Sequence, residues 1–285
     1  MNNILDLILH RASLKKRTIG IGILPQNLAE SKKYLYAQEF ADVIPCSTYN
    51  ELLNLLYTNK VEGIVRGELD SSYELFNELG IKYNFKKDFR VSIIKDVNGK
   101  IFFFGPTSVR WNHCLEDKKQ YVLRVVEHIK GFGIREKDIK IALLLPMHQN
   151  DITELKAVKS MVDKDSLTQL KFLEKASIEN GELVNYLAKT GLNVKDYDNR
   201  IERAIEENVT FIVPFNGIYG NAISRALWLV DRRKIDLKDK AGLISLQLLT
   251  ENYYDWVIEN TAASEVDFSY HIISAVAWLN RKISN

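Results

Sequence analysis

The sequence predicts an α/β protein built on mostly parallel sheets. Short apolar, β-branched runs alternate with amphipathic helical patterns, an order typical of a parallel sheet covered on both faces. The composition, 46% hydrophobic and 27% charged, is that of a soluble globular protein. A chain of 285 residues is longer than one small hydrophobic core usually supports, so one large or two moderate domains are expected.

The first part of the chain alternates between helical and extended patterns. The N-terminal segment is apolar and then basic, the reverse of a secretory signal, and its apolar run is too short to span a bilayer. It predicts an amphipathic helix, with a surface anchor as the alternative. Ser47 and Thr48 are candidate N-caps, Glu51 can close a capping box on either, and Gly80 is expected to end a later helix. The predicted strands are 17–24, 42–46 and 61–69, and the predicted helices are 26–40, 47–59 and 71–80.

The pattern changes at 88–106, where two strand-like runs flank Asn98-Gly99, the strongest short signal for a hairpin. It predicts an antiparallel excursion on an otherwise parallel sheet. A helix over 114–133 follows, with Gly131 and Gly133 at its end. The remaining predicted elements are a strand at 140–146, helices at 151–191 and 198–208, a strand at 209–213, a helix at 221–231, a strand at 241–249 and a closing helix at 264–283 capped by Ser264.

The charges are balanced and well mixed, because 39 basic and 37 acidic residues leave a net charge of +2. We therefore expect neither nucleic acid nor a membrane surface as a partner. Cys46 and Cys114 lack CxxC spacing, which argues against metal or dithiol chemistry and favours a reduced, cytoplasmic protein. The chain has no GxxxxGK[ST], HExxH or GxSxG motif, and "IGIGIL" lacks the third glycine of a dinucleotide fingerprint. We predict no metal site, and these patterns leave the cofactor unidentified.

The joint "VPFNGIYGNAIS" is the first candidate site, because open α/β sheets bind ligands beyond the carboxyl ends of their strands. Gly217 and Gly220 permit positive φ and a close approach of ligand to backbone. The amides of the following helix would form an anion site, with Asn221 as cap or contact and Arg225 reaching back from one turn inside. The alternative is that Asn216-Gly217 only makes the turn and Asn221 only caps the helix.

Arg66 is the second candidate. It directly follows the predicted strand "VEGIV" and precedes Gly67, so its guanidinium should emerge at the ligand end of the sheet. The planar fork of arginine suits carboxylate or phosphate. The alternative is a salt bridge with Glu68 or Asp70. His148, at another predicted strand end, is a lesser candidate.

Several segments in order resemble the MtxX type of methanogenesis marker proteins. They are "VEGIVRG", "NGKIFFFGP", "LEDK", "VPFNGIYGNAISRAL" and "ENTAASEVDFSYHIISAVAWL". These archaeal proteins are named as subunits of a methyltransferase, and they are similar to the phosphate acetyl- and butyryltransferases of the isocitrate dehydrogenase-like fold. The resemblance implies two α/β domains, with 107–240 inserted into a domain made of 1–106 and 241–285. It further implies a cleft between them, with Arg66 and the loop 216–221 facing one another across it.

The resemblance also implies a function and partners. The chain would be a cytoplasmic, homodimeric transferase-like protein that binds a small anionic or acyl/nucleotide-bearing ligand, such as a coenzyme A ester, in connection with methyl transfer in methanogenic metabolism. Methyltransferase subunits would be its protein partners.

The chain departs from the family pattern at two places. Phosphotransacetylases carry a Ser-Arg pair where this chain has Asn260-Thr261-Ala262, and the MtxX type has a Gly/Arg-rich loop where this chain has "MHQNDITELKAVKSMVDKD". Three functions therefore stay open: an MtxX-type transferase, a phosphate acyltransferase acting on acyl-coenzyme A, and a non-catalytic accessory subunit of a methyltransferase complex. The missing Ser-Arg pair argues against the second.

Overall fold

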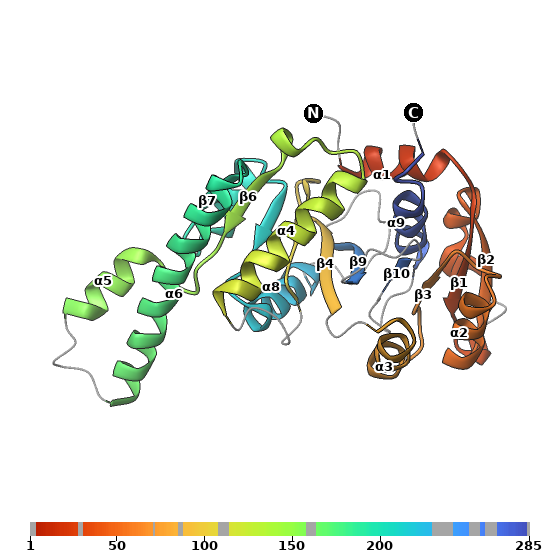
Figure 1. Ribbon diagram of the computed structural model, residues 1–285, viewed down its shortest axis with the longest axis horizontal. Helices are drawn as coiled ribbons and strands as arrows, with labels where there is room; N and C mark the ends of the chain where they lie inside the picture. Colours follow the sequence, from red (N-terminus) through yellow and green to blue (C-terminus); the bar gives the residue numbers. More distant parts are fainter. Residues whose placement is uncertain are drawn as a thin grey trace. The chain divides into compact units, whose positions relative to one another are not determined.

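The computed structural model describes residues 4–27, 31–70, 72–84, 88–107, 114–157, 164–229, 242–250, 257–259 and 267–283 (Figure 1). The chain forms two compact units. Unit 1 comprises 1–101, 128–134 and 228–285, and unit 2 comprises 102–127 and 135–227. The domain boundaries that the family resemblance implies stay a prediction.

The sheet of unit 1 is mostly parallel. Its strands are β1 (Arg17–Gly22), β2 (Ala41–Cys46), β3 (Gly63–Val65), β4 (Asp88–Lys95), β9 (Gly242–Thr250) and β10 (Val257–Glu259). They lie in the order β2-β1-β3-β10-β9-β4. β1 pairs in parallel with β2 and β3, and β3 pairs in parallel with β10, whereas β9 runs antiparallel to both β10 and β4. The predicted parallel sheet with an antiparallel part is confirmed.

The helices of unit 1 include one that is buried all round. They are α1 (Ile4–Ser13), α2 (Tyr49–Tyr57), α3 (Ser72–Tyr83) and α9 (Ser269–Leu279), with 3-10 turns η1 (Pro25–Asn27), η2 (Ser31–Tyr34) and η3 (Tyr36–Glu39). α9 is buried on every side and lies against α1, β9 and β10 (Figure 1). The α-helix predicted over 26–40 is wrong, since the described part of this segment forms the three 3-10 turns. The predicted cap Ser264 lies outside the described residues.

The capping box of α2 is confirmed. The Thr48 hydroxyl accepts the amide hydrogen of Glu51 over 3.2 Å, while the Glu51 carboxylate accepts the backbone amide of Ser47 over 2.7 Å and its hydroxyl over 2.9 Å. Thr48 is therefore the cap, and Glu51 bonds back to Ser47. These hydrogen bonds, led by the backbone bond from Ser47, lower the pKa of Glu51.

Helix α3 passes through Gly80, so the prediction that Gly80 ends it is wrong. A glycine inside a helix costs about 1 kcal/mol relative to alanine, which tertiary packing can offset. Tyr83 packs on Tyr57 with ring centroids 6.1 Å apart, and the Lys82 ammonium lies 5.3 Å from the centroid of the Tyr57 ring. The chain leaves the helix at Asn84, whose φ is +51°.

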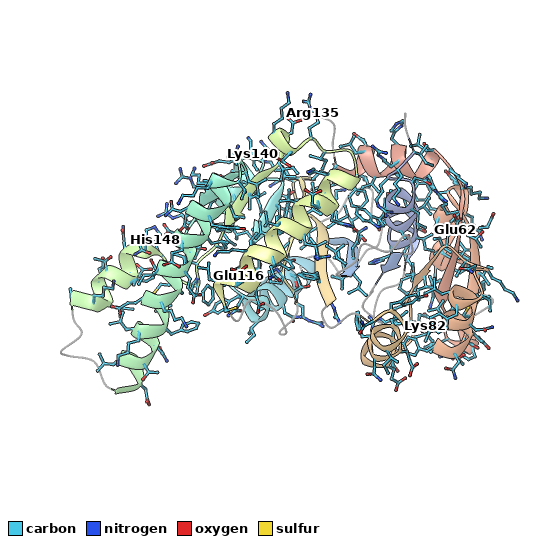
Figure 2. The ribbon with its side chains drawn as sticks, viewed as in Figure 1. Glu62, Lys82, Glu116, Arg135, Lys140 and His148 are labelled. Carbon is cyan, nitrogen blue, oxygen red and sulfur yellow. The ribbon has the colours of Figure 1, made fainter. Side chains whose placement is uncertain are left out.

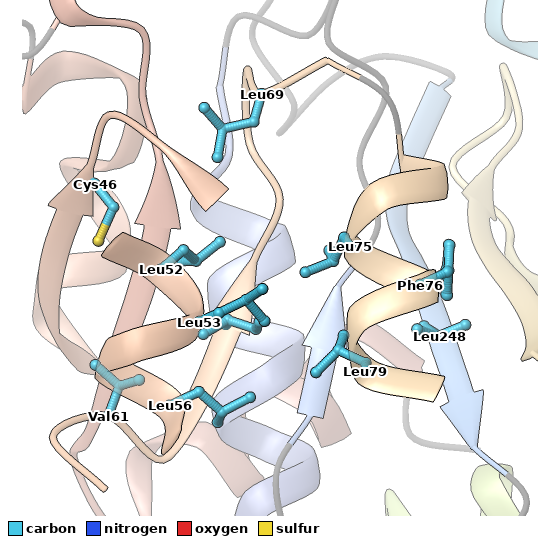
Figure 3. Close-up of a cluster of buried hydrophobic side chains, with 11 residues drawn as sticks. Cys46, Leu52, Leu53, Leu56, Val61, Leu69, Leu75, Phe76, Leu79 and Leu248 are labelled. Carbon is cyan, nitrogen blue, oxygen red and sulfur yellow. The ribbon is translucent and has the colours of Figure 1, made fainter. Parts of the chain in front are cut away.

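A leucine-rich cluster joins α2 and α3 to the sheet (Figure 3). Periodic apolar positions along both helices supply it, which accounts for their amphipathic patterns. Its buried members are Cys46, Leu52, Leu53, Leu56, Val61, Ile64, Leu69, Leu75, Phe76, Leu79 and Leu248.

The predicted turn at Asn98-Gly99 follows β4. The Asp96 carboxylate accepts the amide hydrogens of Asn98 over 3.0 Å and of Lys100 over 2.6 Å. Gly99 has φ +81°, a conformation that glycine adopts at little cost.

The sheet of unit 2 is parallel. Its strands are β5 (Ile101–Phe104), β6 (Lys140–Leu143), β7 (Asn193–Asp196) and β8 (Phe211–Val213), in the order β5-β8-β6-β7. The pairs β5/β8, β8/β6 and β6/β7 are all parallel. Their carboxyl ends therefore meet at one edge of the sheet, which we call the carboxyl edge of unit 2.

The remaining helices largely follow the predicted pattern. They are α4 (Leu115–Gly131), α5 (Gln149–Ala157), α6 (Lys164–Lys189), α7 (Ile201–Glu206) and α8 (Gly217–Leu229), with the 3-10 turn η4 (Glu136–Asp138). The helical pattern predicted over about 151–191 corresponds to two helices, because α5 ends at Ala157 and α6 begins at Lys164. α8 begins at Gly217, four residues before the predicted start. No helix in the described part of the chain combines the length and the apolar character needed to cross a bilayer.

Candidate functional site

The loop after β3 depends on two glycines that approach one another closely. A Cβ atom at Gly67 would lie 2.0 Å from the carbonyl oxygen of Gly22, and one at Gly22 would lie 2.2 Å from the carbonyl oxygen of Arg66. Gly67 also has φ +61°. The end of β1 and the loop after β3 can come together only without side chains there. The second glycine of "IGIG" thus has a packing role.

A buried carboxylate fixes the same loop from the side of β1. Glu68 is 6% exposed, and its carboxylate accepts the amide hydrogen of Leu24 and the side-chain amide of Asn27, both over 2.9 Å, as well as the ammonium of Lys33. Burial raises the pKa of Glu68, but the hydrogen bonds from Lys33, Leu24 and Asn27 outweigh it, so the pKa lies below its usual value. Glu68 therefore holds the loop as an ionised carboxylate.

Tyr49 of α2 holds the other end of this loop. Its hydroxyl donates to the carbonyl oxygen of Leu69 over 3.2 Å and also to that of Asp70. Burial raises the pKa of Tyr49 to about 12, and the nearby positive charge of Arg66 opposes that rise. Arg66 is half-buried, with its Nε atom buried, and it lies in a segment that is fixed on both sides.

In unit 2, the helix cap of the candidate loop is Asn216. Its side-chain oxygen accepts the amide hydrogens of Ile218 and Tyr219, each over 3.0 Å. The expectation that Asn221 caps this helix is wrong, because Asn216 supplies the cap one turn earlier. Two of the first-turn amides that we expected to bind an anion are therefore already bonded to Asn216.

Asn221 has a different role inside α8. Its side-chain amide donates to the carbonyl oxygen of Thr107 over 3.1 Å, and its side-chain oxygen accepts Nε of the exposed Arg225 over 3.3 Å. Asn221 thus ties α8 to the segment that follows β5. Arg225 points back along the helix, as expected, but toward Asn221.

Gly217 and Gly220 both lie within the helix, so the expectation that they supply positive φ is wrong. Gly220 is instead needed for close packing. A Cβ atom there would lie 1.8 Å from the carbonyl oxygen of Pro106 and 2.8 Å from Cγ of Pro214. The first turn of α8 therefore sits directly on the segment after β5. Whether the residues of this loop also bind a ligand stays a prediction.

His148 joins two loops at the carboxyl edge of unit 2 (Figure 2). Nδ1 accepts the amide hydrogen of Asn150 over 3.1 Å at the start of α5. Nε2 lies 3.3 Å from a carboxylate oxygen of Asp198 and 2.9 Å from a guanidinium nitrogen of Arg200. Both ring nitrogens face polar partners of the fold, which gives His148 a structural role.

The structure adds a residue that the sequence reading missed. Lys118 of α4 is only 5% exposed, and its Nζ lies 3.3 Å from a carboxylate oxygen of Glu179 on α6 and 4.4 Å from the centroid of the Phe215 ring. Burial lowers the pKa of the Lys118 ammonium, and the carboxylate of Glu179 opposes this effect. Lys118 falls on the helical stripe that buries Tyr121 and Val122, and a lysine in such a stripe is the signal that could have identified it.

Phe215 connects this lysine to an exposed aromatic rim. The ring of Phe172 meets it edge-on with centroids 5.4 Å apart, and that of Tyr219 does so at 6.1 Å. Phe172 is 47% exposed and Tyr219 is 40% exposed. The carboxyl edge of unit 2 therefore carries a buried cation beside apolar rings that face solvent.

Metal chemistry finds no support among the described residues, which contain no group of three or more His, Cys, Asp or Glu side chains placed to hold an ion. Both cysteines are free thiols, Cys46 buried and Cys114 exposed. Burial raises the pKa of Cys46 to about 11, so its thiol is unreactive at neutral pH.

Solved structures that this chain resembles include a phosphotransacylase and phosphotransacetylases. A branched-chain phosphotransacylase from Enterococcus faecalis superposes with a TM-score of 0.55 at 13% identity, over 100% of this chain and 96% of the other. The EutD phosphotransacetylase from Staphylococcus aureus superposes with a TM-score of 0.56 at 10% identity, over 99% and 100%. The chain thus has the phosphotransacetylase-like fold, as expected.

In sequence, the chain is similar to the mtx subunit X proteins, which confirms the resemblance inferred from its segments. It is 28% identical over 176 residues to "Putative methyltransferase mtx subunit X" of Methanosarcina barkeri, a match covering 62% of this chain and 58% of that protein. It is 24% identical over 249 residues to the protein of the same name from Methanosarcina mazei, over 80% and 81%. The first match thus spans less than two thirds of that relative's length. No family model matches the chain.

Proposed function

We propose that this chain is an mtx subunit X-like protein that binds a small anionic ligand, acyl- or nucleotide-bearing, at the strand-end loops of a phosphotransacetylase-like fold. The ligand would serve methyl transfer in methanogenic metabolism, in the cytoplasm. The observation that most supports this proposal is the fixed loop of Arg66, because it holds a guanidinium at the end of a parallel strand. That edge is where open α/β sheets bind ligands.

Rigidity is what makes the Arg66 loop suited to binding. Gly67 has a left-handed φ and packs against Gly22 with no room for a Cβ atom at either position. Glu68 and Tyr49 then fix the loop by hydrogen bonds to Leu24 and to Leu69. An arginine presented by an ordered loop loses little further entropy when it binds a carboxylate or phosphate. The substrate-binding residues of the proposal are Arg66, Gly67, Asn216, Gly217, Gly220, Asn221 and Arg225.

A second function, the accessory subunit of a methyltransferase complex, is favoured by the names of the sequence relatives, which call them subunits. Phosphate acyl transfer is favoured by the names of the fold neighbours. It is disfavoured by Asn260-Thr261-Ala262, which stand where the phosphotransacetylase family carries a Ser-Arg pair and which lie outside the described residues.

A thermal-shift screen separates these functions. The ligands are inorganic phosphate, coenzyme A, acetyl-coenzyme A, S-adenosylmethionine and a cobalamin. A ligand at a hundred times its Kd stabilises the folded state by about 2.7 kcal/mol, which visibly raises Tm. A shift with a coenzyme A compound supports acyl chemistry, and a shift with a methyl carrier supports methyl transfer. If none of the five raises Tm, the ligand-binding proposal fails and the accessory-subunit function is favoured.

We also propose that the chain forms a homodimer. Light scattering on the purified chain would then give a mass of roughly twice the 32.8 kDa of one chain. A mass equal to that of one chain across the accessible concentration range would contradict the dimer.

A further inference from the structure

We infer that Lys118 is a ligand-contacting residue, whose ammonium leaves Glu179 to bind the anionic group of the ligand beside the Phe215 ring. This inference rests on the proposed function and adds to it a cation in unit 2 that the sequence patterns did not identify. The ligand it fits has an anionic group joined to an apolar or planar portion.

The position of Lys118 in the fold is the first support. β5 and β8 are neighbouring parallel strands, paired at Phe103 with Phe211 and at Phe104 with Ile212. α4 follows β5 along the chain, and Phe215 follows β8 directly. Lys118 and Phe215 thus come from adjacent strand-to-helix joints at the carboxyl edge of unit 2, where α/β sheets place their ligands. Their contact of 4.4 Å sits immediately beside the Asn216 loop.

The energetics of the position are the second support. Lys118 is the fourth residue of α4, and a cation in the first turn of a helix opposes the helix dipole. Its burial also removes the ammonium from water, which the single carboxylate of Glu179 and the face of Phe215 only partly offset. An apolar side chain would fill this place in the core-facing stripe at lower cost. Departures of this kind from local packing preference concentrate at functional sites.

Glu179 is placed so that it can release the ammonium. Its side chain is 18% exposed, and the second carboxylate oxygen lies 3.7 Å from Nζ of Lys175, one turn earlier on α6. When an anion takes the place of Glu179 beside Lys118, the carboxylate keeps Lys175 as a partner and remains in contact with water. Exchange of one anion for another at Lys118 therefore leaves no buried charge alone.

The exposed aromatic rim indicates the chemistry of the part of the ligand that lies beyond its anionic group. Phe172 and Tyr219, whose rings meet that of Phe215, are both exposed, as is Ile218, the neighbour of Tyr219 in sequence. Such side chains bind an acyl chain or a planar ring better than a fully hydrated anion. A simple inorganic anion would use only Lys118, whereas a larger organic anion would use the rim as well.

The test measures binding of coenzyme A, acetyl-coenzyme A and inorganic phosphate by calorimetry to the full chain and to four variants. Lys118→Met keeps the length of the side chain without its charge, and we expect it to bind the organic anions at least about tenfold more weakly with Tm not lowered. Lys119→Met is the matched control. Its lysine also has one carboxylate partner, Glu116 at 3.4 Å, and one ring partner, Tyr186 at 4.6 Å, so wild-type binding is expected.

Arg66→Ala separates this inference from the proposed function. If Arg66→Ala loses binding while Lys118→Met retains it within about twofold, Lys118 is only a structural ion pair and the inference is wrong. If the wild type binds none of the three probes, the inference is wrong, whereas the proposed function fails only if none of the five ligands of the thermal-shift screen binds.

Glu179→Gln decides the case in which Lys118→Met does not fold. Removal of the competing carboxylate should tighten binding of the organic anions by more than about twofold, because Lys118 is then free of its internal partner. Unchanged or weaker binding by a folded Glu179→Gln variant would contradict the inference that the ligand anion replaces Glu179 beside Lys118.

Discussion

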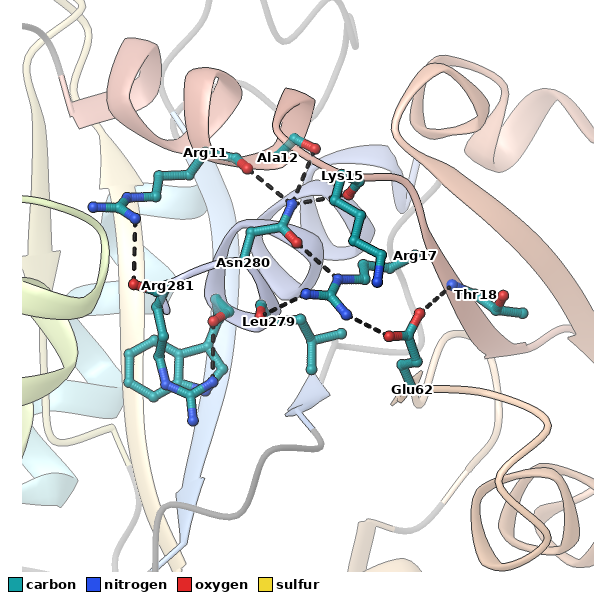
Figure 4. Close-up of polar contacts among 10 residues, drawn as sticks. Arg11, Ala12, Lys15, Arg17, Thr18, Glu62, Leu279, Asn280 and Arg281 are labelled. Atoms are coloured by element: carbon teal, nitrogen blue, oxygen red, sulfur yellow. Dashed lines mark hydrogen bonds and ion pairs between the residues drawn. The ribbon is translucent and has the colours of Figure 1, made fainter. Parts of the chain in front are cut away.

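Nε of Arg17 donates a hydrogen bond to the side-chain oxygen of Asn280 over 2.7 Å, which joins β1 to the residue that follows α9 (Figure 4). The side-chain amide of Asn280 donates in turn to the carbonyl oxygens of Arg11 and Lys15, each over 2.9 Å, and of Ala12 over 3.3 Å. Asn280 is fully buried. One side chain thus fastens the end of the first helix and the first strand to the end of the last helix.

Asn280→Ala should lower the free energy of unfolding by about 2–4 kcal/mol, because each lost hydrogen bond contributes roughly 0.5–1.5 kcal/mol and several buried polar groups lose their partner. Urea unfolding monitored by circular dichroism measures it. Asn77→Ala, at an exposed position of α3, is the control and should change the value by less than about 0.5 kcal/mol. Equal effects for the two variants would show that Asn280 does not anchor the termini.

Gly220→Ala should destabilise the chain by about 1–3 kcal/mol, because its Cβ atom would lie 1.8 Å from the carbonyl oxygen of Pro106. Gly181→Ala, in the middle of α6 with no atom within 4 Å of its Cβ, should stabilise it by up to about 1 kcal/mol. Denaturant midpoints of the two variants measure the contrast. A Gly220→Ala variant as stable as the wild type would contradict the close approach of α8 to the segment after β5.

His128 should make stability fall in acid. Its ring is buried against Trp278 with centroids 4.2 Å apart, and Nε2 bonds the side-chain oxygen of Gln247. Burial lowers the pKa of His128 from 6.5 to about 3, so only the neutral form fits the fold. The neutral ring of His128 contributes its full share to the free energy of unfolding above pH 6.5. This contribution is lost as pH falls from 6.5 toward 3, at about 1.4 kcal/mol per pH unit. Unfolding free energies of the wild type and His128→Gln, measured from pH 8 to pH 4, should converge as pH falls. Parallel curves would show that His128 does not titrate in this window.

Arg66→Ala should abolish binding of whichever ligand stabilises the wild type, while Tm stays nearly unchanged. Arg66 lies in a loop whose conformation depends on Gly67, Glu68 and Tyr49 rather than on the arginine side chain. Calorimetry and thermal unfolding of the same samples measure both quantities, with the exposed Arg135→Ala as control. A loss of stability above about 2 kcal/mol would identify Arg66 as part of a structural ion pair instead.

The sequence by itself determined the class of fold and several local details. Alternation of β-branched runs with amphipathic helices was sufficient for a mostly parallel α/β protein, because periods of 2 and 3.6 residues report directly on burial. The Thr48–Glu51 capping box and the Asn98-Gly99 turn were readable because their hydrogen bonds join residues within a few positions of one another. The candidate loops at Arg66 and Asn216 could also be identified from the sequence, because each directly follows a predicted strand.

Only the tertiary structure decided which residues do what at those loops. Asparagine is a good helix cap at position 216 or 221. Asn216 is the cap in the structure, where the helix already includes Gly220, packed directly against the carbonyl oxygen of Pro106. Lys118 was not identified from the sequence, because the groups that enclose it, Glu179 of α6 and Phe215, come from distant segments of the chain. These outcomes depend on contacts between segments far apart in the chain, and such contacts override local propensity because burial and packing are worth more than the differences between local preferences.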